Sequence, residues 1–184
     1  GQLAVLSLVV LCLGAGLLGR DVYLRIKGAL AGRLVERALA AHLADGAGHR
    51  PWAWADFEAV ARLEAPRLGV MRPVLTGASG ESLAFGLGHV DGTAWPGAPG
   101  NLVLVGHRDS WASFMGDLRR GDALRLVYHG GAAVYDVVRI EVVQASEAWS
   151  LDPSGPDRLT LITCHPVDGV VPTHDRHVIT CSSL

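Results

Sequence analysis

The pattern of the chain changes near Ala65, and this change limits its fold more than any other feature. After Ala65, short apolar runs with a two-residue period alternate with turns that contain glycine or proline. These runs predict strands over residues 67–75, 83–85, 102–105, 123–128, 133–143, 159–163 and 177–181, and a short helix near 111–118. Many short strands separated by tight turns favour a mainly β domain, built as a sandwich or a barrel.

The residues before Ala65 have a helical pattern. Residues 3–18 carry no charge and predict an apolar helix, slightly shorter than the about 20 residues that cross a bilayer. A cleaved signal peptide and an uncleaved anchor both fit this run, and we favour the anchor because no small-residue cleavage motif stands near Arg20. Residues 22–44 predict an amphipathic helix that extends the first one and then lies against the domain. A short helix is predicted over 56–62, with Trp52 and Trp54 before it, either at a membrane interface or covering the β domain.

The composition argues against several classes of function. The chain has 16 Lys and Arg against 18 Asp and Glu, so it lacks the basic surface that nucleic-acid binding requires. Its three cysteines, Cys12, Cys164 and Cys181, are too few for a disulfide framework. No run of acidic residues predicts a calcium site.

Three chemically active side chains stand at or near the ends of predicted strands. Cys164 ends one strand and is followed by His165 and Pro166, and Pro166 cannot donate to a sheet. His107 follows the buried run 102–105, and Arg176 leads into the last strand. Taken singly, the cysteine could be a small core residue and the other two ordinary strand-end side chains. Together they supply a nucleophile, a proton carrier and a fixed positive charge for an oxyanion.

At these positions the sequence resembles the sortase family. The sortase strand that ends TLxTC matches residues 160–164, and the sortase histidine after a buried strand matches His107 within residues 104–109. The sortase arginine lies on the strand after the cysteine loop, where Arg176 stands. The resemblance is closest to the single-anchor sortases of Gram-negative proteobacteria, because residues 51–56, 77–80 and 99–101 also look like that group.

The resemblance implies a fold and a location. We expect a sortase-type closed β-barrel of about seven or eight strands, with short helices and a catalytic groove at one end. The expected segments are a transmembrane anchor (1–19), a helical linker (20–64) and the catalytic barrel (65–184). We also expect a single-pass protein of the inner membrane, in contact with membrane lipid, whose catalytic domain lies on the periplasmic side.

The resemblance also implies a membrane-anchored cysteine transpeptidase of the thiol peptidase class. Cys164 would be the nucleophile, His107 the proton carrier and Arg176 the oxyanion donor. The partner would be a secreted or membrane protein with an LPxTG-like C-terminal sorting motif, and an amine acceptor of undefined identity would resolve the thioester acyl-enzyme. This chemistry needs no cofactor and no metal. Because a bridge to Cys181 would remove the nucleophile, we expect Cys181 to point away from Cys164.

Neighbouring residues are expected to support the site. Thr163 would line the groove with its backbone near the reacting carbonyl. His165, a further candidate for substrate binding, stands where related enzymes often carry a tyrosine or another residue. Asp109 either orients His107 and its loop or caps the helix near 111–118. His174 and His177 flank Arg176 and are expected to pack or to lie on the surface.

Two alternative functions remain open on the sequence. The first is a metal-binding module, because Cys and His side chains are concentrated in a short span; its candidate ligands are Cys164, His165, His174, His177 and Cys181. Their spacing matches no zinc motif, and the positive charge of Arg176 among them would repel a cation. The second is a catalytically inactive membrane-tethered scaffold, against which the intact Cys, His and Arg set argues.

Overall fold

A computed structural model describes residues 1–146, 156–169, 171 and 173–184. The chain divides into two compact units, residues 1–34 and residues 35–184. The first unit is helical and belongs to α1 (Gln2–Asp45), whose last turns are part of the second unit. The second unit holds the remaining elements, which include the short helix α2 (Gly80–Phe85) and the 3-10 turns η1 (Pro66–Leu68) and η2 (Ser113–Asp117).

The N-terminal helix corrects our prediction of location. Within the described part of the chain, no helix combines the length and the apolar character needed to cross a membrane. The prediction of a single-pass inner-membrane protein with a periplasmic catalytic domain is therefore wrong. The uncharged run 3–18 is short for a bilayer, and α1 continues without a break into a charged stretch where Arg25 pairs with Asp21 at 2.7 Å. The helix over 22–44 extends the first one, as predicted, within the single helix α1. The segment boundaries at 19/20 and 64/65 stay predictions.

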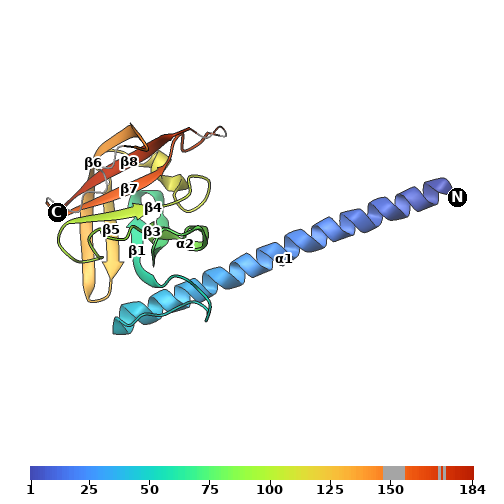
Figure 1. Cartoon of the computed structure of the whole chain (residues 1–184), viewed down its shortest axis with the longest axis horizontal. Helices are drawn as coiled ribbons and strands as arrows, with labels where there is room; N and C mark the ends of the chain where they lie inside the picture. The colour runs from blue at the N-terminus through green and yellow to red at the C-terminus, as the bar shows by residue number, and fades with distance from the viewer. Residues whose placement is uncertain (147–155, 170, 172) are drawn as a thin grey trace. The chain divides into compact units, whose positions relative to one another are not determined.

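The described strands close into a barrel, as the resemblance to sortases implies (Figure 1). They are β1 (Ala59–Ala65), β2 (Val70–Thr76), β3 (Leu87–His89), β4 (Asn101–Val105), β5 (Ala123–Tyr128), β6 (Gly131–Gln144), β7 (Arg158–Cys164) and β8 (Asp175–Ser183). Their order around the barrel is β1-β2-β3-β4-β7-β8-β6-β5. The β2–β3 and β4–β7 pairs are parallel, and the others are antiparallel.

Two local predictions are wrong, both around the first strands. The residues 56–62, predicted as a helix, run into β1, which is paired on both sides, with β2 and with β5. Its Ala, Arg, Leu and Glu residues favour a helix locally, but two ladders of tertiary hydrogen bonds override this preference. Residues 83–85, predicted as a strand, belong to α2, whose first turn is capped because the Ser79 hydroxyl accepts a hydrogen bond from the Ser82 N–H at 3.0 Å.

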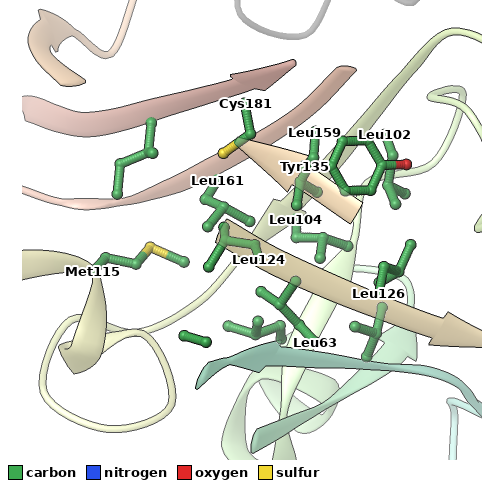
Figure 2. Packing of buried hydrophobic residues seen from close by; sticks show 14 of the residues in the cluster. Leu63, Leu102, Leu104, Met115, Leu124, Leu126, Tyr135, Leu159, Leu161 and Cys181 are labelled. Atoms are coloured by element: carbon green, nitrogen blue, oxygen red, sulfur yellow. The ribbon is translucent and has the colours of Figure 1, made fainter. Parts of the chain in front are cut away.

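The core of the second unit lies inside the barrel. Figure 2 shows leucines of several strands converging there, with the Cys181 sulfur and the ring of Tyr135 among them. The fully buried members include Leu63, Leu102, Leu104, Leu124, Leu126, Leu159 and Leu161. Met115 from η2 adds to this core, so the turn that follows β4 is held by apolar packing at its inner side.

A second apolar cluster joins the end of α1 to the outside of the sheet. Leu39 of α1 packs with Phe57 and Leu75, all at most 1% exposed. Trp52 lies edge-on to Phe57 and Phe85, with ring centroids 5.6 and 5.1 Å apart. Trp52 therefore covers the sheet, one of the two roles left open by the sequence, whereas Trp54 is 80% exposed.

Candidate active site

The pairing of three strands brings the predicted catalytic residues to one end of the barrel. β7 lies between β4 and β8, and the three strands run side by side in Figure 1. Cys164, the last residue of β7, is the direct partner of Arg176 on β8. Val105, the last residue of β4, is aligned with Ile162 of β7. The Gly106 N–H, just beyond β4, still donates to the Ile162 carbonyl, and His107 follows at the same end of the barrel as Cys164.

The predicted catalytic residues lie on the outer face of the sheet. Leu104, Leu161 and Ile179 are aligned across β4, β7 and β8, and all three belong to the buried core inside the barrel. Side chains alternate between the two faces of a strand. Cys164 is three positions from the inward-facing Leu161 on β7, and Arg176 is three positions from the inward-facing Ile179 on β8, so both face outward. His107 is exposed, and Cys164 and Arg176 are half-buried. The thiol, imidazole and guanidinium can therefore be reached by a substrate that lies over the sheet.

Buried backbone contacts hold the segment before His107 in place. The Gly106 N–H donates to the Ile162 carbonyl at 3.2 Å, and the Thr163 hydroxyl donates to the Gly106 carbonyl at 2.8 Å. Gly106 is required by space, since a Cβ there would lie 2.8 Å from Leu87 Cδ2 and 2.9 Å from Ala112 Cβ. The His107 carbonyl then accepts the N–H groups of Ser110 and Ala112, at 3.2 and 3.1 Å. Hydrogen bonds thus hold the backbone on both sides of the His107 side chain.

Arg176 keeps its positive charge available. One terminal nitrogen of its guanidinium donates to the carbonyl of Asp175 at 3.0 Å and more weakly to that of His174 at 3.4 Å. Within the described ranges, no ion pair joins this guanidinium to a carboxylate. Since the neutral carbonyls leave the charge uncompensated, the guanidinium can stabilise a negative oxygen that forms near Cys164.

The supporting residues take different positions. Thr163 is 2% exposed and, being adjacent to Cys164 on the strand, faces the opposite side. Asp109 is exposed in the turn after His107, and Ala112 rather than Asp109 stands at the N-cap of η2. The roles that the sequence suggested for Thr163 and Asp109 in the groove stay predictions.

His165, just beyond β7, lies beside His177, the strand partner of Thr163. Their rings are stacked at 6.4 Å with an interplanar angle of 12°, and both line a cavity of about 370 Å³ together with Ser113, Gly116, Asp117, Val167 and Asp168. Burial and the adjacent His165 lower the pKa of His177, so this imidazole is more strongly held in its neutral form. His177 therefore packs, as expected, and His174 is exposed.

The other candidate metal ligands do not converge with Cys164. Cys181 is the partner of Leu159, faces the interior and is fully buried, so it points away from Cys164 as predicted. Burial raises the pKa of the Cys181 thiol to about 12. In the part of the chain that the structure describes, no three His, Cys, Asp or Glu side chains are arranged to hold a metal ion.

One contact near the site was not predicted from the sequence. Arg108, which directly follows His107, donates a hydrogen bond to the carbonyl of Pro166 at 2.9 Å. The only hint in the sequence is its position beside the histidine, because the partner is a backbone carbonyl far along the chain.

Comparisons with known proteins agree with this architecture. The sortase-domain family model matches residues 63–184. Sortase D from Bacillus subtilis (strain 168) is 30% identical over 118 residues, which are 64% of this chain and 60% of that protein. Sortase A from Corynebacterium diphtheriae has 26% identity and a TM-score of 0.63 over 71% of this chain and 63% of its own. Sortase C-1 from Actinomyces oris has 25% identity and a TM-score of 0.62 over 82% and 97%.

The first relatives are longer than the region they share with this chain, which spans 60% and 63% of their lengths. The family model nevertheless covers more than half of the sequence, including every residue of the candidate site. The chain therefore belongs to the sortase family.

Proposed function

We propose that this chain is a cysteine transpeptidase that cleaves an LPxTG-like C-terminal sorting motif and transfers the substrate protein to an amine acceptor. What supports the proposal most directly is the register of β7 and β8, which pairs Cys164 with Arg176, together with the end of β4, after which His107 follows at the same end of the barrel. Membership of the sortase family supports the same chemistry. The match of residues 51–56, 77–80 and 99–101 supports, as a finer proposal, a relationship to the sortases of Gram-negative proteobacteria.

The first half of the reaction forms the acyl-enzyme. The Cys164 thiolate, stabilised by the protonated His107, attacks a backbone carbonyl of the motif, and a C–S bond forms while the carbonyl electrons move to oxygen. Arg176 donates to this oxyanion. The tetrahedral intermediate collapses, the C–N bond breaks, and His107 gives its proton to the leaving amine. The C-terminal tail departs and a thioester remains on Cys164.

The second half transfers the acyl group. The acceptor amine attacks the thioester, His107 takes the proton from the attacking nitrogen, and the Cys164 thiolate leaves. Water in place of the amine would give hydrolysis. The exposed position of His107 supports both proton transfers, because substrate and acceptor can approach the same imidazole.

Peptides with LPxTG-like sequences test the proposal. We expect the wild-type chain to form a thioester adduct detectable by intact-protein mass spectrometry, and to yield a ligated product when a primary amine is added. Cys164→Ala should form no adduct, and Arg176→Ala should lower kcat/KM by at least about 10²-fold, the size of losing one oxyanion donor. Wild-type turnover by Arg176→Ala would refute its role, and an adduct on Cys164→Ala would refute the nucleophile.

A further inference from the structure

We propose that Arg108 is a positioning residue of this site: by binding the loop that follows Cys164, its guanidinium holds the His107 imidazole at its working distance from the thiol. The proposal rests on the function proposed above for Cys164 and His107. It assigns to Arg108 no contact with the substrate.

The contacts of Arg108 join two segments that are far apart in the sequence. Its guanidinium donates to the carbonyl of Pro166 at 2.9 Å and, at the limit of a hydrogen bond, to that of Val171 at 3.5 Å. Pro166 and Val171 lie in the segment that connects Cys164 to Arg176, and Arg108 is covalently next to His107. One half-buried side chain therefore connects the neighbourhoods of all three proposed catalytic residues.

Other hydrogen bonds fix the bases of both segments. On the histidine side, the Gly106 carbonyl accepts the Thr163 hydroxyl. On the cysteine side, the His165 N–H donates to the Asp175 carbonyl at 3.1 Å, and the Thr173 hydroxyl donates to the His165 carbonyl at 2.7 Å. These bonds hold the ends of the strands. The bond from Arg108 to the Pro166 carbonyl adds a link between the two segments beyond the sheet, next to His107.

An arginine suits this position chemically. Its planar guanidinium has several donors in a fixed arrangement and no acceptor, so it can bind more than one backbone carbonyl at a time. A charged donor also binds a carbonyl more strongly than a neutral one. Methionine would keep most of the apolar stem without any donor, and lysine would keep one compact charged donor, so these two variants separate packing from hydrogen bonding.

The first experiment compares Arg108→Met, Arg108→Lys and the control Arg125→Met in the full chain. Arg125 lies on β5, is 48% exposed and pairs with Glu64, so its loss removes a charge without touching the site. We expect Arg108→Met to lower kcat for peptide cleavage by up to about 10²-fold with little change in KM, because the reacting groups are misplaced. Arg108→Lys should recover part of the loss, and Arg125→Met should behave as wild type. An unchanged kcat in Arg108→Met, or a loss confined to KM, would overturn the proposal.

The second experiment needs no substrate and tests whether Arg108 acts through His107. The rate of Cys164 carbamidomethylation by iodoacetamide is measured against pH in the wild type, Arg108→Met, His107→Ala and the double variant. We expect each single variant to slow the reaction near neutral pH and the double variant to be no slower than His107→Ala, since residues that act as a unit are non-additive. Additive losses would mean that Arg108 acts elsewhere. If wild type forms no thioester with any sorting peptide, the proposed function fails, while this alkylation cycle still decides the role of Arg108.

Discussion

Cys164 and Thr163 are adjacent on β7 but face opposite sides of the sheet. The proposed nucleophile therefore lies on one face, and the side chain that binds the backbone before His107 lies on the other. Cys164 faces outward beside Arg176, whereas the hydroxyl of Thr163 is buried and binds the Gly106 carbonyl at 2.8 Å. In the TLxTC segment, the proposed nucleophile therefore stands at the end of the strand, and Thr163 anchors the segment that carries His107. The sequence shows both residues but not which face of the strand each occupies.

Replacing Thr163 with valine tests this anchor. The change keeps the shape of the side chain but leaves the buried Gly106 carbonyl without the hydroxyl donor. We expect the free energy of unfolding to fall by about 1–3 kcal/mol and kcat for peptide cleavage to fall as well, because the turn bearing His107 loosens. Urea unfolding and steady-state kinetics measure the two effects. Thr163→Ser, which restores the hydroxyl, should recover both, and wild-type stability in Thr163→Val would contradict the role of this bond.

At the scale of the elements, the turns around the barrel are held by polar contacts as well as by the core. Arg67 of η1 binds Asp122 through both of its oxygens, at 2.5 and 2.6 Å, and also the Asp117 carbonyl at the end of η2. The Asp122 carboxylate additionally accepts the Arg119 N–H at 2.7 Å. The Asp122 carboxylate therefore connects η1 and the end of η2 to the start of β5. β5 is the strand that pairs with β1.

This cluster predicts how stability depends on pH. The hydrogen bond from Arg67 is the main cause that lowers the pKa of Asp122 below its ordinary value. A carboxyl whose pKa is lower in the folded state stabilises the fold above its unfolded pKa, and the contribution is lost as pH falls through the folded pKa. We therefore expect Asp122→Asn to lower the melting temperature at neutral pH and to converge with wild type in strong acid, below both pKa values.

Thermal unfolding across the acid range measures this effect. The control is Glu64→Gln, which removes the carboxylate partner of the exposed Arg125 and should change the melting temperature only slightly, since surface pairs contribute little. A melting temperature for Asp122→Asn that differs from wild type equally at neutral and strongly acid pH would show that the charge of Asp122 does not matter.

At the scale of the whole molecule, closure of the barrel decides which cysteine can react. The chain has three cysteines, and all are free thiols. Cys181 packs among the leucines inside the barrel (Figure 2), whereas Cys164 is half-buried at the end of β7. Burial, which raises the pKa of the Cys181 thiol to about 12, keeps it in its unreactive neutral form.

Thiol labelling should therefore report global unfolding at Cys181. In a Cys12→Ala, Cys164→Ala variant, we expect iodoacetamide to label Cys181 only as the barrel opens, at a rate that rises with urea in step with the loss of structure by circular dichroism. In a Cys12→Ala, Cys181→Ala variant, Cys164 should be labelled promptly in the native state. Prompt labelling of Cys181 without denaturant would show that the barrel interior is open to solvent.

The sequence by itself determined the later strands and the residues of the candidate site. The apolar runs at 102–105, 123–128 and 159–163 lie within β4, β5 and β7, because period-2 patterns bounded by turns survive in almost any sheet. The sequence also shows Cys164, His107 and Arg176 at or near strand ends. These properties are local, so a local pattern is enough to identify them.

Only the tertiary structure decided where non-local pairing overrides local preference. The residues of β1 favour a helix by their local sequence, but they form a strand because β2 and β5 supply hydrogen bonds on both sides. The Arg108–Pro166 contact and the alignment of Cys164 with Arg176 likewise depend on strand order and register. This contact and this alignment are set by which strands pair when the barrel closes. The free energy that stabilises the barrel comes from hydrogen bonding and burial between segments that are distant in the chain.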